Sequence, residues 1–118
     1  MANPKQMAIV QHLHERSLDG TLEWTDSIIR GAFEVSLSNY TIRVSVENED
    51  YRVSIVDGQG TTVESFTDVD LDRGAGATNQ GYYKMLSEIY DMARRIAYGV
   101  DEALNSILAE LKKGKMPF

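Results

Sequence analysis

Between residues 33 and 56 apolar and polar side chains alternate with a period of two, and this pattern limits the fold more than any other feature. The apolar positions form three runs: Phe33, Val35 and Leu37; Tyr40, Ile42, Val44 and Val46; Tyr51, Val53 and Ile55. Turn-forming residues separate the runs at 38–39, 48–50 and 57–60. A fourth strand is expected over residues 61–66. Alternation predicts one buried and one solvated face, and the short turns favour an antiparallel meander.

Helical periodicity flanks the meander on both sides. A first helix is expected over roughly Pro4 to Leu18, because Asn3 is a good N-cap and Pro4 suits the first helical turn. A long helix is expected over residues 80–98, and Asp101 can cap a last helix. The predicted fold class is therefore α+β: an N-terminal helix, a four-stranded antiparallel meander with one face covered by helices, and two C-terminal helices.

The two C-terminal helices differ in the width of their apolar surface. The long helix has an apolar arc close to half its circumference, wider than the roughly 100° stripe of a single contact. Within one chain, this arc can cover the sheet with one half and contact another helix with the other half. In a homodimer, the second half would contact another copy. The last helix has one apolar face, made of Leu104, Ile107, Leu108 and Leu111.

The segments on either side of the meander suggest a small-ligand site. Leu22 and Trp24 have strand spacing, so we expect an extended arm that pins Trp24 onto the core. Residues 67–81 are expected to form one long acidic and glycine-rich loop, which exceeds the usual length of a connection. A pocket lined by Trp24, Tyr82 and Tyr83, with this loop as its lid, is the alternative to a protein-binding function.

Composition excludes several classes of function. The 118 residues suit a single domain and include no cysteine, which excludes disulfide scaffolds, zinc ribbons and thiol nucleophiles. A formal net charge of −6 argues against binding nucleic acid phosphates. No apolar run approaches the roughly 18–20 residues of a membrane span. We therefore expect a cytoplasmic protein that binds neither nucleic acid nor a membrane.

The acidic charge is concentrated in one part of the chain. Residues 47–72 hold eight acids and one base, so the remainder is near neutral. We expect an acidic edge that steers a basic protein partner, with Asp68, Asp70 and Asp72 as candidate binding residues. Tyr98 is a further candidate, because it projects onto the polar side of its helix beside the helix end.

No constellation of residues indicates catalysis or a bound metal. The Asp68-x-Asp70-x-Asp72 spacing begins like a calcium-binding loop, but Arg73 and Asn79 stand where such a loop needs glycine and glutamate. His12 and His14 lie two residues apart on a helix and point in different directions. We expect no cofactor, no metal and no enzymatic activity.

Two segments resemble a group of small bacterial proteins of unknown function. One is Leu22-x-Trp24 ahead of a meander. The other runs Ala93-Arg94-Arg95-x-Ala97-x-Gly99-Val100-Asp101, with Leu104, Leu108 and Leu111 after it. The resemblance covers roughly residues 13–111 and implies a bacterial or phage-derived cytosolic protein, but no functional residue. The expected function is that of a non-enzymatic interaction or regulatory accessory module.

Overall fold

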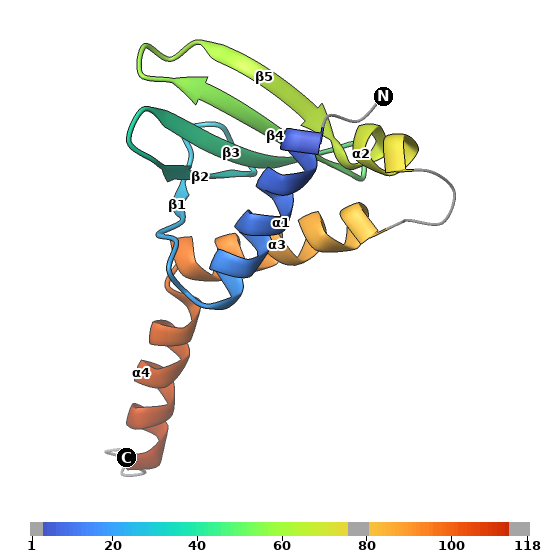
Figure 1. Ribbon diagram of the computed structural model, residues 1–118. Helices are drawn as coiled ribbons and strands as arrows, with labels where there is room; N and C mark the ends of the chain where they lie inside the picture. Colours follow the sequence, from blue (N-terminus) through green and yellow to red (C-terminus); the bar gives the residue numbers. More distant parts are fainter. Residues whose placement is uncertain (1–3, 76–80, 114–118) are drawn as a thin grey trace.

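The computed structural model describes residues 4–75 and 81–113. The elements in chain order are α1 (Pro4–Leu18), β1 (Thr25–Asp26), β2 (Ala32–Ser36), β3 (Tyr40–Glu47), β4 (Asp50–Asp57), β5 (Thr62–Thr67), α2 (Asp68–Ala75), α3 (Gly81–Ala97) and α4 (Val100–Lys113). The strands form one antiparallel sheet in the order β1-β2-β3-β4-β5, and α1 and α3 lie against one of its faces (Figure 1). The α+β meander is confirmed, with five strands instead of four.

The strand that the sequence did not predict is β1, which pairs with β2 through Thr25 and Asp26. It belongs to the arm that was expected to hold Trp24. The Trp24 side chain is only 2% exposed, and its indole Nε1 donates a hydrogen bond to Ser17 Oγ at 3.0 Å. The prediction that the arm pins Trp24 onto the core is confirmed.

The wide apolar arc of α3 is covered within the chain. One side of α3 contacts the sheet and the other contacts α1, and Tyr82, Leu86, Ile89 and Ala93 are buried between them. Polar contacts fix α1 on α3, including a 2.6 Å contact between His14 Nε2 and Glu88 Oε1. The intramolecular explanation of the arc is therefore the one the structure supports.

Residues 67–81 do not form one long loop, and that prediction is wrong for the first half of the segment. Residues 68–75 form α2, and Leu71 on this helix is fully buried. Thr67 and Asp70 form a reciprocal cap: Thr67 N donates to Asp70 Oδ2, and Asp70 N donates to Thr67 Oγ1. Residues 76–80 lie outside the described part of the chain.

The uncovered face of the sheet is polar, as the alternation predicts. Glu34 and Arg43 are cross-strand neighbours there and form an ion pair of 2.9 Å. Three expected core residues are instead about half exposed: Leu37 at 49%, Tyr40 at 47% and Val46 at 45%. Leu37 follows the end of β2, Tyr40 begins β3 and Val46 is the second-last residue of β3, so all three lie at strand ends beside a turn. No helix within residues 4–75 and 81–113 is long and apolar enough to cross a membrane.

Candidate protein-interaction site

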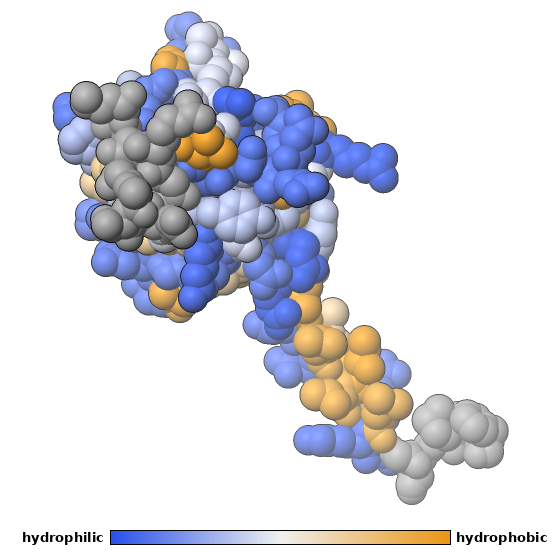
Figure 2. Space-filling model, turned by 90° about the vertical axis from the view of Figure 1, so that its right-hand side faces the viewer, coloured by the Kyte–Doolittle hydropathy of each residue, from blue (hydrophilic) through white to orange (hydrophobic). Residues whose placement is uncertain are grey.

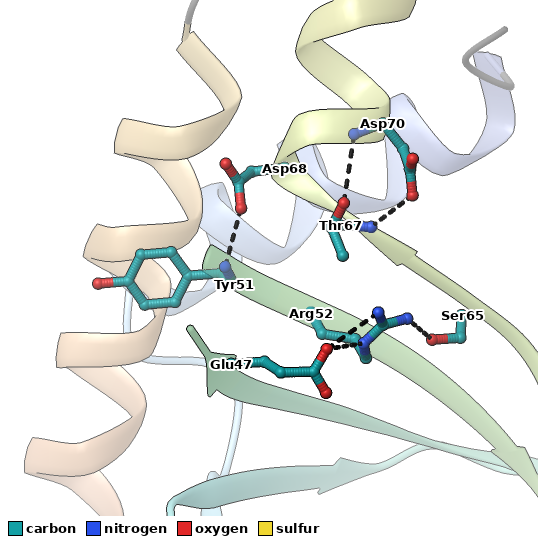
Figure 3. Close-up of polar contacts among 7 residues, drawn as sticks. All are labelled: Glu47, Tyr51, Arg52, Ser65, Thr67, Asp68 and Asp70. Atoms are coloured by element: carbon teal, nitrogen blue, oxygen red, sulfur yellow. Dashed lines mark hydrogen bonds and ion pairs between the residues drawn. The ribbon is translucent and has the colours of Figure 1, made fainter. Parts of the chain in front are cut away.

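The acidic residues expected to bind a partner are largely used inside the fold (Figure 3). Asp68 is only 3% exposed, and its Oδ1 accepts a 2.8 Å hydrogen bond from the backbone N of Tyr51. Asp70 caps α2 through Thr67. Asp72 lies on α2, but its side chain is outside the described part. The assignment of Asp68 to a partner-binding surface is therefore wrong: this carboxylate ties the start of α2 to β4.

The other acids of residues 47–72 do not form a single edge. Glu47 accepts hydrogen bonds from the guanidinium of Arg52, which also donates to Ser65 Oγ (Figure 3). Asp57 accepts hydrogen bonds from two backbone N–H groups of its own turn. Asp50 and Asp57 stand at opposite ends of β4, roughly 20 Å apart. The predicted acidic edge is thus divided between the two ends of the sheet.

Tyr98 and Tyr83 were predicted for two different sites but belong to one row of aromatic rings. The row runs Tyr83, Tyr51, Tyr90, Phe33 and Tyr98, with ring centroids 5.2–5.6 Å apart. Tyr90 is at its centre and donates a 2.9 Å hydrogen bond to the carbonyl of Gly31. Burial raises the pKa of the Tyr90 phenol, and the neighbouring Tyr98 and Tyr51 add to the effect. The row joins α3 to the sheet, although the outer half of Tyr98 remains exposed.

Trp24, Tyr82 and Tyr83 do not converge on a ligand pocket. Trp24 and Tyr82 are packed in the core, whereas Tyr83 is about half exposed. Trp24 contacts the end of α1 at Ser17, and the Tyr82 hydroxyl accepts a hydrogen bond from Gln11, about 9 Å earlier along the same helix. The first half of the expected lid is the helix α2. The predicted pocket is therefore wrong in its lining.

A different hollow lies between α1 and the turn that joins β2 to β3. It has a volume of about 290 Å³, and its walls are mainly apolar. We call it the α1 groove, and its apolar lining includes Ile9, Leu13, Leu22, Leu37 and Ile42. It is at the small end of the range for ligand pockets and holds no acid. Among the described residues, no group of three or more His, Asp or Glu side chains is placed to hold a metal ion.

An uncovered apolar surface lies on α4. This helix has no buried residue, and it projects from the rest of the molecule at its junction with α3 (Figure 1). The apolar stripe of α4 consists of Leu104, Ile107, Leu108 and Leu111, which are 49–63% exposed. Figure 2 shows these side chains gathered along one side of α4, below a body whose facing surface is mostly hydrophilic. The sequence predicted one apolar face on this helix, and nothing in the described chain covers it.

The junction between α3 and α4 fixes the direction in which α4 projects. Gly99 has φ +62°, a left-handed conformation that suits glycine at the end of a helix. Arg95 Nη2 lies 2.7 Å from Asp101 Oδ1 across this junction. Asp101 and Glu102 occupy the first turn of α4, and Lys112 and Lys113 the last. These charges suit the helix dipole and leave one end of α4 acidic and the other basic.

Comparisons with family models, with curated proteins and with solved structures find no significant match to this chain.

Proposed function

We propose that this protein is a non-enzymatic interaction module of the cytoplasm and that it binds its protein partner through the apolar stripe of α4. One observation carries the proposal: α4 presents four large aliphatic side chains in a row, and each is about half exposed. Single exposed apolar residues are normal on a protein surface, but a contiguous patch is typical of an interaction site. The stripe is contiguous, because its members recur at helical spacing on one face.

The energetics of an isolated helix support a partner. A helix of 14 residues is marginally stable alone in water, since most helical stability in proteins comes from packing an apolar face. In this protein α4 contacts the rest of the molecule mainly at its junction with α3. Covering the exposed half of each aliphatic side chain contributes about 1 kcal/mol. Binding therefore removes apolar surface from water and stabilises α4 at the same time.

The other surfaces fit this function less well. The uncovered face of the sheet carries paired charges and hydroxyls, which water solvates adequately. Among the acids of residues 47–72, Asp57 accepts hydrogen bonds within its own turn, Asp70 caps α2 and Glu47 pairs with Arg52. The α1 groove, at about 290 Å³, has room for only a few side chains. The α4 stripe leaves four aliphatic side chains about half exposed in a row, and it is the surface that a partner would cover.

Cross-linking in cells that make the protein tests the proposal. A lysine-reactive reagent reports contacts at Lys112, which lies beside the stripe on the last turn of α4, and at Lys113 on the same turn. We expect α4-linked products from the natural chain and none from the double variant Leu104→Glu/Leu108→Glu. The matched control is Ala109→Glu, which adds the same side chain to the opposite side of the same helix. Identical α4-linked products from the double variant and the natural chain would refute the proposal.

A further inference from the structure

We infer that the partner of the α4 stripe is the α4 stripe of a second copy of this chain, in an antiparallel arrangement. The inference rests on the proposed function, because it names the occupant of the same surface. Two copies of the same apolar stripe can cover each other, and under a two-fold axis each residue contact occurs twice. The stripe lies on a helix that projects clear of its own body, so a second copy can approach along its full length (Figures 1 and 2).

The distribution of charge on α4 selects the antiparallel direction. The first turn carries two acids and the last turn two lysines. An antiparallel pair sets the acidic end of each helix beside the basic end of the other and opposes the two helix dipoles. A parallel pair would bring like ends together. The α4 helix of a second, antiparallel copy therefore matches the charges of the first.

The positions of Asp101 and Lys112 around the helix agree with this arrangement. They are eleven residues apart, which is about three turns, so their side chains project from the same flank of the stripe to within roughly 20°. Equivalent flanks face each other in an antiparallel pair. Asp101 of one copy thus approaches Lys112 of the other at both ends. Asp101 already contacts Arg95 within its own chain, so the pairing extends an existing charge cluster.

The size of the stripe sets the strength of the contact. Four half-exposed aliphatic side chains present a few hundred Å² per copy, the size of a functional surface patch. A pair of such patches falls at or below the lower limit of about 1,200 Å² for stable interfaces. We therefore expect a reversible dimer with a dissociation constant in the micromolar range.

Sedimentation equilibrium of the full chain, from roughly 1 μM to 1 mM, tests the inference. The natural chain and Ala109→Glu are expected to show the same monomer–dimer equilibrium. Leu104→Glu/Leu108→Glu should raise the dissociation constant at least 100-fold. Fluorescence of the buried Trp24 confirms in each case that the body is folded. A natural chain that stays monomeric throughout would overturn the inference, and so would a double variant that still dimerises.

Charge reversal tests the direction of pairing. In the antiparallel pair, Lys112→Glu/Lys113→Glu weakens dimerisation about tenfold, and adding Asp101→Lys/Glu102→Lys restores it. A parallel pair would keep like charges together in both variants, so the absence of weakening and rescue would overturn the antiparallel arrangement. A monomeric natural chain that still gives α4-linked products in cells would refute self-pairing and leave the proposed function standing. A natural chain that neither dimerises nor gives α4-linked products would refute both self-pairing and the proposed function.

Discussion

Arg95 and Asp101 are joined by a 2.7 Å ion pair that spans the junction between α3 and α4. It ties the first turn of α4 to the end of α3. The pair lies at the surface and is therefore weak by itself. Its importance is positional, since it helps to set the angle at which the apolar stripe is presented.

We expect Asp101→Asn to loosen the start of α4. The backbone N of Ala103 donates to the carbonyl of Gly99 at 2.9 Å, in the turn that follows the ion pair. Loss of an exposed ion pair should speed hydrogen exchange at this amide about two- to threefold. Glu102→Gln is the control, because it removes the same charge from the same turn and leaves the Arg95 contact in place. Equal acceleration in the two variants would mean that the dipole, and not Arg95, stabilises this end.

Ser17→Ala should destabilise the body more than its small change in volume suggests. The Trp24 indole N–H is buried and donates to Ser17 Oγ, so the variant leaves a buried donor without a partner. We expect the free energy of unfolding to fall by about 1–3 kcal/mol, measured by urea denaturation with Trp24 fluorescence. Ser36→Ala, on the exposed end of β2, should change it by less than about 0.5 kcal/mol. A similar loss in both variants would contradict this role of Ser17.

Glu49→Gly should stabilise the protein. Asn48 and Glu49 join β3 to β4 in a two-residue turn, and both have positive φ, at 53° and 73°. Such a turn favours glycine at its second position, where a side chain costs about 1 kcal/mol. Urea denaturation should show a gain of that order for Glu49→Gly and almost none for Glu49→Gln. A gain in the Gln variant would assign the effect to charge repulsion instead.

Alkaline pH should destabilise the fold through Tyr90. Its pKa in the folded chain is raised above the ordinary value of 10.0, so the folded state holds the phenolic proton more tightly than the unfolded state. This stabilising contribution is fully present below pH 10 and is lost as the pH rises through the folded pKa.

Thermal denaturation at a series of pH values checks this expectation. Tyr90→Phe should be less stable by up to about 1 kcal/mol at pH 8, because the hydrogen bond to the Gly31 carbonyl is lost. It should also show a shallower loss of stability above pH 10. Tyr40→Phe, which removes an exposed phenol, is the control. A Tyr90→Phe profile parallel to that of the natural chain would contradict the role assigned to Tyr90.

Much of the fold could be predicted from periodicity, and the exceptions have local physical causes. The bounds of α1 match the prediction because a proline and an apolar stripe mark them. The helix α2 was missed because its acids and glycines suggested a loop, although Thr67-x-x-Asp70 is a capping box and Leu71 is an anchor. Two residues of β1 are too few to show a period.

The candidate site could be predicted only in part. The apolar face of α4 was visible as a repeat in the sequence, because amphipathic spacing shows that a face is to be buried. Such spacing does not show what buries it, so the exposure of Leu104 and Leu108 emerges only from the fold. The acids near Asp68 suggested a surface because local sequence does not reveal a backbone donor such as Tyr51 N, which comes from another strand.

Hydrogen exchange of the α4 backbone, measured at several protein concentrations, tests the central claim most directly. An uncovered helix of this length frays, whereas a paired helix is protected. We expect protection of residues 103–111 to rise with concentration in the natural chain and in Ala109→Glu, and to stay low in Leu104→Glu/Leu108→Glu. Protection that is independent of concentration and equal in all three proteins would contradict the pairing of the stripe with a second copy of the chain.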